Sequence, residues 1–319
     1  MLLEVKGLTK LYPNQKNFFS KSHIYSYAVN NVSFTLDSGK TLSLVGESGS
    51  GKTTTGKMVL RLVEPTAGKI VFNNISLLEL SKKSMLKMRK DMQIIFQDPY
   101  GSLNPRMTIC QLISEGFSIH TNFTKKKRTK ISSELLEMVG LSHHYLNRYP
   151  HEFSGGQRQR ISIARAIALR PKLIICDESV SSLDVSVRAQ ILDLLNNLQS
   201  QFKISYLFIT HDLNVAAHIS DDVIVMFEGK IVERAKANDF FKNPLHPYSK
   251  SLLAAIPSIN TLEKERDIDI ILNDRQNKID YHNGCPFFNR CPDVLDICLK
   301  INPSLMEIND NHFASCHKF

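Results

Sequence analysis

The sequence lacks any apolar run that approaches the roughly 18 residues a membrane-spanning helix needs. Its first residues, MLLEVKGLTK, also lack the long apolar core of a secretory signal peptide. These absences argue against an integral membrane protein or an exported one, so we expect a cytosolic chain, or one that docks on a membrane from the cytosol. An internal repeat is absent as well, so each motif described below occurs in one copy.

The sequence contains fewer acidic residues than basic ones. The 319 residues contain 31 Asp and Glu against 40 Lys and Arg, which gives a formal net charge of +9. Part of the excess lies in one cluster, made of Lys125, Lys126, Lys127, Arg128 and Lys130. A basic excess can indicate contact with nucleic acid or anionic lipid. A short lysine run is more often a solvated helix face or loop, and we interpret this one in that way.

Cysteine is scarce until the C-terminal end of the chain. Cys110 and Cys176 stand alone, and Cys176 lies in the apolar run LIIC, where a buried thiol behaves as a small hydrophobic group. The other four are Cys285, Cys291, Cys298 and Cys316, with the spacing C-x5-C-x6-C-x17-C. Because disulfides are rare in the cytosol, such a group points first to a bound metal.

Four thiolates suit either an iron–sulfur cluster or a tetrahedral zinc ion. Zinc ligands usually come in pairs that are two to four residues apart, and the spacings here are longer. We therefore favour an iron–sulfur cluster, with a zinc site and four free thiols as the alternatives.

The apolar pattern predicts a mixed α/β fold. Strands are expected at residues 2–6, 31–36, 41–45, 69–73, 93–96, 172–176, 205–210 and 222–227, and helices at 52–62, 131–139, 155–169 and 185–199. Short apolar strands separated by helices favour a largely parallel sheet that is covered on both faces. Strand patterns are missing from about residue 100 to 165, which suggests a helical insertion. Residues 258–283, rich in Asp, Asn, Lys and Glu, are typical of a linker.

The stretch GESGSGKT, residues 46–53, lies between an expected strand and an expected helix. Its pattern, G-x-x-x-x-G-K-T, is that of a turn whose backbone N–H groups surround phosphates at a helix N-terminus. Lys52 would reach the β- and γ-phosphates, Thr53 would bind Mg²⁺, and Gly46, Gly49 and Gly51 would let the backbone approach closely. A chance match is the alternative, and the strand and helix around the motif argue against it.

Two acids end the apolar strand pattern LIICDE at residues 173–178. Since ligands of a parallel sheet bind at the carboxyl ends of its strands, Asp177 and Glu178 should face the phosphate loop. We expect Asp177 to hold Mg²⁺ and Glu178 to polarise the attacking water. Solvated acids at a turn would be the alternative if this motif stood alone.

A second glycine-rich element, FSGGQ at residues 153–157, opens the helix pattern ISIARAIAL. Ser154 and the N–H groups of Gly155 and Gly156 would make another anion site at a helix N-terminus. A lone motif of this kind could be a simple helix cap. Because it precedes LIICDE by about twenty residues, we predict a second phosphate-binding surface.

Together these motifs resemble the ATP-binding cassette superfamily over nearly the whole chain. GESGSGKT resembles its Walker A motif, FSGGQ its signature and LIICDE its Walker B motif, while Gln97 in IFQDP, Asp184 in SSLD and His211 in ITHDL match its Q-loop, D-loop and switch histidine. Tyr12 in KLYPN matches the aromatic residue that stacks on adenine, with Tyr25 and Tyr27 as alternatives.

The resemblance implies an α/β fold in which a RecA-like P-loop core carries an antiparallel β subdomain and a helical signature subdomain, followed by a small Cys-rich segment. The expected domains are an ATPase domain at 1–257, with its helical part at about 100–165, a linker at 258–283 and the Cys-rich segment at 284–319. The implied catalytic residues are Glu178, His211 and Gln97, and the implied Mg²⁺ ligands are Thr53, Gln97 and Asp177. The implied ATP-binding residues are Tyr12, Gly46, Glu47, Ser48, Gly49, Ser50, Gly51, Lys52, Thr53, Thr54, Gln97, Asp177, Ser154, Gly155, Gly156, Gln157 and Asp184.

Cassettes of this superfamily pair head to tail, so each ATP would lie between the Lys52 loop of one subunit and the Ser154 loop of the other. The stretches DPYGSLNPRMT, NPLHPYSKSLLAAIP and GCPFFNRCPDVLDICLKINPSL are similar to those of oligopeptide, dipeptide and nickel importer ATPases, in particular the oligopeptide F type. In related members the last of these holds a four-iron, four-sulfur cluster. The HPY residues themselves we interpret as a packed helix with a capping turn that carries no chemistry.

The resemblance therefore implies an ATPase that powers peptide uptake at the cytoplasmic face of a bacterial membrane. Its expected partners are a second ATPase subunit, preferably a homologue of the D type, two permease subunits and an extracellular binding protein, with no nucleic acid. The alternatives are a nickel or metal-chelate importer and a cassette that acts on nucleic acid or ribosomes. A P-loop kinase or GTPase would have no use for FSGGQ. Because Lys52, Glu178 and Ser154 are distant from the cysteines in sequence, we expect ATP binding to survive loss of a cluster.

Overall fold

The computed structural model describes residues 1–13, 25–255 and 284–319. The expected linker at 258–283 lies outside these described residues. In the part of the chain that is described, no helix is both long and apolar enough to cross a membrane.

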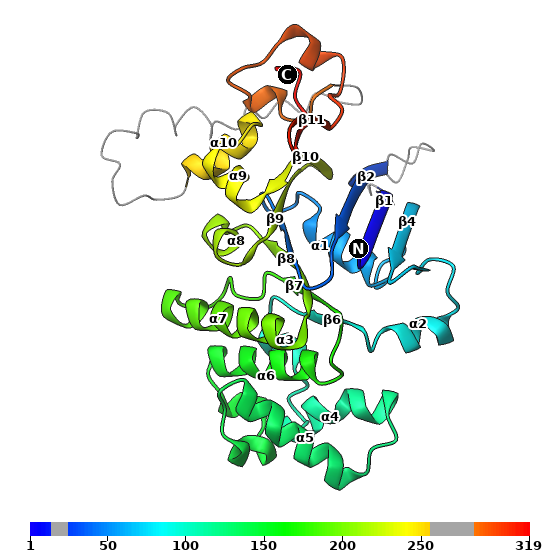
Figure 1. Ribbon diagram of the computed structural model, residues 1–319, viewed down its shortest axis with the longest axis vertical. Coiled ribbons are helices and arrows are strands. Elements are labelled where there is room, and N and C mark those ends of the chain that lie inside the picture. Colours follow the sequence, from blue (N-terminus) through cyan, green and yellow to red (C-terminus); the bar gives the residue numbers. More distant parts are fainter. Residues whose placement is uncertain (14–24, 256–283) are drawn as a thin grey trace, which may run out of the picture.

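The centre of the molecule is an eight-stranded sheet with the order β11-β12-β10-β9-β3-β8-β7-β6 (Figure 1). Its strands are β3 (Thr41–Val45), β6 (Met92–Ile95), β7 (Leu173–Asp177), β8 (Ser205–Thr210), β9 (Asp222–Phe227), β10 (Lys230–Lys236), β11 (Met306–Asn309) and β12 (His312–Ala314). The strands from β9 to β6 are parallel, whereas β10, β11 and β12 pair in antiparallel fashion. Every residue of β3, β7 and β8 is buried, as expected for a covered parallel sheet.

A smaller antiparallel sheet has the order β2-β1-β4-β5. It consists of β1 (Leu3–Pro13), β2 (Tyr25–Leu36), β4 (Ala67–Phe72) and β5 (Ile75–Ser76). Its apolar residues share one buried cluster with α1 (Lys52–Val59), α2 (Lys82–Met88) and one face of the large sheet. This is the antiparallel subdomain expected from the sequence.

Between β6 and β7, a stretch described throughout, the chain forms helices only. These are α3 (Pro99–Ser102), α4 (Ile109–His120), α5 (Lys125–Met138), the 3₁₀ turns η1 (His143–Asn147) and η2 (Pro150–Glu152), and α6 (Gly155–Ile167). The predicted helical insertion is therefore present. The lysine cluster lies on the first turns of α5, where Lys125, Lys126, Lys127 and Lys130 are exposed, as expected for a solvated helix face.

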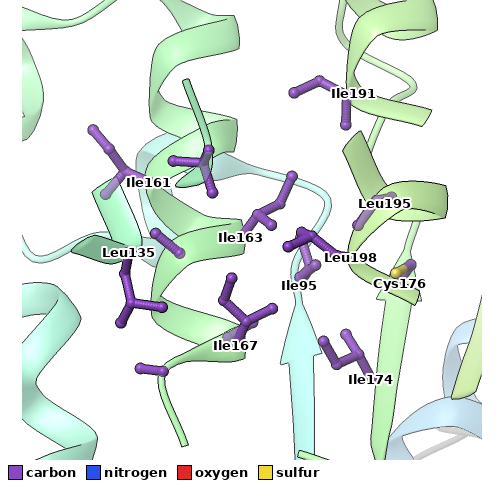
Figure 2. Packing of buried hydrophobic residues seen from close by; sticks show 14 of the residues in the cluster. Ile95, Leu135, Ile161, Ile163, Ile167, Ile174, Cys176, Ile191, Leu195 and Leu198 are labelled. Carbon is purple, nitrogen blue, oxygen red and sulfur yellow. The ribbon is translucent and has the colours of Figure 1, made fainter. Parts of the chain in front are cut away.

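One core joins this helical part to the large sheet (Figure 2). Ile163 and Ile167 of α6 lie on the side of Ile95 of β6 and of the apolar residues of α7 (Val185–Phe202), whereas Ile161 lies on the side of Leu135 of α5. Cys176 is fully buried in this core, and burial raises the pKa of its thiol, so it acts as the small hydrophobic group that the sequence indicated.

The C-terminal segment joins the edge of the large sheet instead of forming a separate unit. Three helices precede the segment in the chain: α8 (Leu213–Ile219), α9 (Ala237–Lys242) and α10 (Pro247–Ala254). The segment itself contains η3 (Phe288–Arg290), η4 (Asp296–Leu299), β11 and β12. Glu233 of β10 is fully buried and accepts hydrogen bonds from the Leu245 and His246 N–H groups and pairs with the ring of His312 at 2.7 Å. One carboxylate thus ties β12 to the turn before α10. This end of the molecule lies opposite the helical part (Figure 1).

Candidate active site

The phosphate loop connects β3 to α1 and needs glycine at two crowded positions. Gly46 has φ +144°, and a Cβ there would lie 2.2 Å from the Met226 carbonyl oxygen. Gly51 has φ +100°, and its Cβ would lie 2.3 Å from the Ala28 carbonyl oxygen. Larger residues would therefore push the loop away from both β9 and β2.

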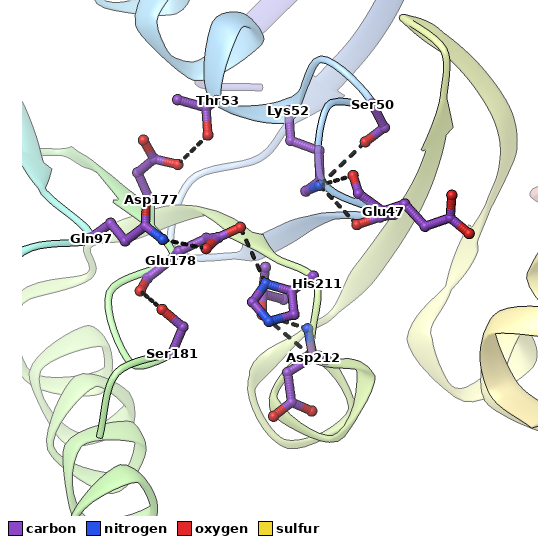
Figure 3. Close-up of polar contacts among 12 residues, drawn as sticks. Glu47, Ser50, Lys52, Thr53, Gln97, Asp177, Glu178, Ser181, His211 and Asp212 are labelled. Carbon is purple, nitrogen blue, oxygen red and sulfur yellow. Dashed lines mark hydrogen bonds and ion pairs between the residues drawn. The ribbon is translucent and has the colours of Figure 1, made fainter. Parts of the chain in front are cut away.

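Lys52 begins α1 and turns its side chain back along the loop (Figure 3). Its Nζ donates hydrogen bonds to the carbonyl oxygens of Gly46 at 2.8 Å and Glu47 at 2.7 Å, and to Ser50 Oγ at 3.2 Å. Burial lowers the pKa of Lys52, and the nearby carboxylates, Glu178 first, oppose that change. A buried ammonium with several oxygen acceptors can exchange them for phosphate oxygens.

Thr53 and Asp177 meet, although they are far apart in sequence. Thr53 Oγ1 donates a hydrogen bond to Asp177 Oδ1 at 2.8 Å. Burial raises the pKa of Asp177, while this hydrogen bond lowers it. A hydroxyl and a carboxylate side by side are hard oxygen donors of the kind that Mg²⁺ prefers, so these residues fit the ion that the sequence implies.

Glu178 lies next to this pair and contacts two other predicted residues (Figure 3). Its Oε2 accepts a hydrogen bond from Gln97 Nε2 at 2.7 Å, and its Oε1 lies 3.2 Å from His211 Nδ1. The backbone of Glu178 has φ +46°, an uncommon value for a residue other than glycine that costs about 1–3 kcal/mol. The Glu178 N–H donates to the Ile209 carbonyl at 2.9 Å, which holds the turn in that conformation.

A pocket of about 230 Å³ gathers these groups. It is lined by Ala28, Ser48, Gly49, Gly51, Lys52, Thr53, Thr54, Gln97 and Glu178. All but Ala28 were predicted from the sequence. The pocket combines N–H groups of a helix N-terminus, a lysine, a candidate Mg²⁺ pair and a carboxylate that can orient water, which is the chemistry of nucleoside triphosphate hydrolysis.

Ser154, Gly155 and Gly156 do not line this pocket. Ser154 caps α6, its Oγ accepts from the Gln157 N–H, and Gln157 Oε1 accepts from the Ser154 N–H at 3.0 Å. A Cβ on Gly156 would lie 2.6 Å from Val187 Cγ1 of α7, so the signature lies against the start of the helix that Asp184 caps. The two predicted anion surfaces of one chain are therefore separate.

Tyr12, Tyr25 and Tyr27 are all exposed on the hairpin of β1 and β2. Tyr12 pairs with Ser26, so these two side chains share one face of the sheet, while Tyr25 and Tyr27 lie on the other face. The register shifts between Lys10 and Leu11, so Ala28, which lines the pocket, lies at a bulge where the alternation of faces is interrupted. Tyr12 as the residue that stacks on adenine therefore stays a prediction, with Tyr25 and Tyr27 as the alternatives on the other face.

Comparisons with known proteins agree with this site. The family model described as ABC transporter matches residues 29–181, and the model described as oligopeptide/dipeptide transporter, C-terminal region, matches residues 232–298. The oligopeptide transport ATP-binding protein AppF of Bacillus subtilis (strain 168) is 43% identical over 100% of this chain and 97% of its own length. The chain belongs to the ABC transporter family. It is an ATPase subunit of that family.

Other relatives of this ABC transporter ATPase support the same assignment. A putative peptide import ATP-binding protein of Brucella ovis is 45% identical over 99% of this chain and 97% of its own length. Among solved structures, the dimeric post-hydrolysis state of the ATP-binding cassette MJ0796, bound to ADP and Pi, matches with a TM-score of 0.66 and 29% identity, covering 74% of this chain and 99% of that one. The expected ATPase fold is confirmed.

The four C-terminal cysteines of the ATPase lie near one another without forming a closed site. Burial raises the pKa of Cys285, and the neighbouring Cys298 and Cys316 raise it further. Cys291, whose pKa is raised to about 11 mainly by burial, lies near Cys316 and Cys285. Even so, no group of three or more His, Cys, Asp or Glu side chains in the described residues is arranged to hold a metal ion.

Two residues that contact the phosphate loop, Tyr248 and Arg290, were not predicted from the sequence. His246 caps α10 through a hydrogen bond from the Tyr248 N–H, so the HPY residues form the capped helix that we expected. The Tyr248 hydroxyl, however, accepts a hydrogen bond from the Glu47 N–H at 2.8 Å. Arg290 of the Cys-rich segment pairs with the Glu47 carboxylate. The HPY motif and the GCPFFNRC stretch were the available signals, and neither points to the loop by itself.

Proposed function

We propose that this ATPase subunit powers the import of oligopeptides or dipeptides through separate permease subunits. The observation that carries the proposal is the pocket lined by Lys52, Thr53 and Glu178, with Asp177 hydrogen-bonded to Thr53 beside it. The peptide substrate is supported by similarity along the whole chain to AppF, which is named an oligopeptide transport ATP-binding protein. A nickel or metal-chelate importer is the second candidate, since the resemblance of the C-terminal stretches includes that group.

Within the pocket, each side chain has a distinct proposed role. Lys52 would bind the β- and γ-phosphates, while Thr53, Asp177 and Gln97 would hold Mg²⁺, which supplies charge neutralisation at the phosphates when it is bound. Glu178 would orient the attacking water and accept its proton, with His211 as its partner at 3.2 Å. Tyr12 would stack on the adenine ring. Each of these roles uses a contact or an exposure that the residue already has.

The signature motif would act across a dimer interface. Ser154, Gly155, Gly156 and Gln157 lie outside the pocket of their own chain, and the α6 N-terminus they form is an anion-binding surface. We propose that they cover the ATP held by a second ATPase subunit, preferably a homologue, with Asp184 at the same interface. ATP would then favour the closed pair and hydrolysis the open one, since the ligand binds the two states with different affinity.

The other expected partners and the location follow from this role. Two permease subunits and an extracellular binding protein would complete the transporter, with this chain on the cytoplasmic face of the membrane and no nucleic acid bound. The four cysteines would take an iron–sulfur cluster, with zinc as the alternative. Their soft thiol donors support this part of the proposal, and metal binding would have to rearrange the side chains, since no group of three or more in the described residues is arranged to hold an ion.

Purification through a tag on this chain, followed by reconstitution, tests the proposed function. We expect permeases and a binding protein to be recovered, and liposomes that contain them to take up short peptides when ATP is supplied on the ATPase side. The same complex with Glu178→Gln is the matched control and should take up none. ATP-driven uptake of nickel, with no uptake of peptide, would identify nickel as the substrate in place of peptides. Recovery of RNA without permeases would overturn the proposed role in import.

A further inference from the structure

The Cys-rich segment reaches the phosphate loop through one ion pair. Arg290 donates from its two terminal nitrogens to the two oxygens of Glu47, at 2.9 and 2.6 Å. This two-bonded geometry is the strong form of an arginine–carboxylate pair. Glu47 lies between Gly46 and the rest of the loop, and Arg290 immediately precedes Cys291. The contact therefore joins the middle of the cysteine motif to the loop that surrounds the phosphates.

Tyr248 holds the same loop residue from a second direction. Its hydroxyl accepts a hydrogen bond from the Glu47 N–H at 2.8 Å, while the Glu47 carbonyl accepts one from Lys52 Nζ at 2.7 Å. Both peptide groups of Glu47 are thus fixed, one by Tyr248 and one by the lysine that is proposed to bind phosphate. A shift of Glu47 would change the acceptors of Lys52 as well as the direction of the loop N–H groups.

Phe287 provides a rigid support for both contacts. It is 1% exposed and packs against the rings of Phe227 and Tyr248, with centroid distances of 5.4 and 5.3 Å. The Arg290 guanidinium lies over the Phe227 and Phe287 rings at 5.7 and 5.6 Å from their centroids. Stacking on aromatic faces restricts the guanidinium, so less conformational entropy is lost when it binds Glu47.

We propose that Arg290 and Tyr248 are positioning residues through which the Cys-rich segment sets the conformation of the phosphate loop, and so the affinity of this ATPase for nucleotide. The proposal needs only ATP binding by the loop and does not depend on which solute is imported. ATP binding is still expected to survive loss of a cluster, but the contact at Glu47 joins the Cys-rich segment to the phosphate loop, so we expect changes in that segment to alter the affinity for nucleotide.

Nucleotide affinity of the full chain tests the proposal. We expect Arg290→Ala to weaken the binding of a fluorescent ATP analogue by roughly 5-fold, the lower end of ordinary coupling between two sites. Arg290→Lys, which keeps the charge but loses the paired geometry, should recover part of the affinity. Tyr248→Phe keeps the packed ring and removes the hydroxyl alone, so it should also weaken binding. In the assembled transporter, KM for ATP should rise more than kcat falls.

Lys318→Ala is the matched control, because Lys318 forms an exposed ion pair with Asp293 at 2.8 Å in the same segment and does not contact Glu47. It should leave affinity unchanged. A double-mutant cycle with Glu47→Gln separates positioning from general loss of structure, since Arg290→Ala should cost little in that background. Equal affinities for Arg290→Ala and Lys318→Ala would overturn the proposal, as would the same loss from Arg290→Ala with and without Glu47→Gln.

Discussion

Gln97 donates a hydrogen bond to the carboxylate of Glu178 at 2.7 Å, and the other oxygen of that carboxylate lies 3.2 Å from His211. Gln97 follows β6, Glu178 follows β7 and His211 follows β8, so three neighbouring strands of the sheet bring these side chains together. Glu178 is thereby held on both oxygens, beside the pocket where the terminal phosphate of ATP is expected.

Glu178→Gln should retain ATP binding and abolish turnover. The substitution keeps the size of the side chain and removes the carboxylate that would orient water and accept its proton, while Lys52 still binds phosphate. ATP hydrolysis by the assembled transporter and nucleotide affinity of the isolated chain are the two measurements. Asp193→Asn, at an exposed acid of α7, should change neither. Near-normal hydrolysis by Glu178→Gln would remove this residue from the mechanism.

Asp177→Asn should raise the thermal stability of the protein without ligands. It should also weaken the further stabilisation that Mg²⁺ gives in the presence of ATP. Burial raises the pKa of Asp177, so its ionised form costs free energy in the folded protein. Because the folded protein holds this proton more tightly than the unfolded chain, wild-type stability gains as pH falls through the folded pKa. The stability gain of the variant over the wild type should thus be largest at pH 7–8 and shrink as pH falls.

Thermal unfolding, measured with and without Mg²⁺ and ATP from pH 8 downward, checks both the change in stability and the loss of the Mg²⁺ effect. Mg²⁺ should add to the stabilisation by ATP in the wild-type protein and should add much less in Asp177→Asn. A variant that is less stable at every pH would show that the charge of Asp177 is well compensated in the fold, and the pH argument would be wrong.

Tyr12→Ala should weaken the binding of ATP by roughly 1–3 kcal/mol, on the scale of base stacking on aromatic side chains. The matched variants are Tyr25→Ala and Tyr27→Ala, which remove exposed rings from the other face of the same hairpin. They should have little effect. Loss of affinity in either of these, with none in Tyr12→Ala, would move the adenine platform to β2.

Ser154→Arg should leave nucleotide binding to the isolated chain intact and block hydrolysis by the assembled transporter. The arginine would lie on a surface that its own pocket does not include, and it would obstruct closure against the partner subunit. Affinity of the monomer and ATPase activity of the complex are compared. If both fall equally, the signature serves the site of its own chain, contrary to the proposed composite site.

Protein purified without oxygen should be brown, with broad absorption near 400 nm, about where thiolate-bound iron–sulfur clusters absorb. Replacing any one of Cys285, Cys291, Cys298 and Cys316 by Ser should remove the colour. Cys110→Ser and Cys176→Ser are the controls and should keep it. A colourless preparation with bound zinc would replace the cluster by a zinc site, and one without metal would leave four thiols.

The nucleotide pocket was predictable because its chemistry lies in short motifs. Gly46 to Thr54 form one continuous stretch, the loop after β3 and the first turn of α1, and the strand predicted at 172–176 brings Asp177 and Glu178 to the same edge as the loop. The predicted strands 41–45, 205–210 and 222–227 match β3, β8 and β9 in both bounds. Burial on both faces leaves continuous apolar runs, which are clear signals in a sequence.

The remaining elements are set by contacts that a local pattern does not contain. Helix α5 begins at Lys125, six residues before the predicted start at 131, because its first turns are basic and carry no apolar periodicity. The short strands β11 and β12 were not predicted, since they depend on distant pairing: β12 pairs with β10, and β11 pairs with β12. Arg290 and Glu47 are 243 residues apart, and no sequence motif with a fixed spacing predicts a contact over that distance.

That separation has a consequence for the order in which the protein is made. The phosphate loop is synthesised 243 residues before Arg290, and at ordinary rates of translation the interval is about 10–50 s. Glu233 is likewise synthesised 79 residues before its partner His312. Strand β10 therefore remains the edge of the growing sheet until β12 has been synthesised and can pair with it. During that period β10 is paired with β9 on one side only, so chaperones or a partner subunit can bind its open edge.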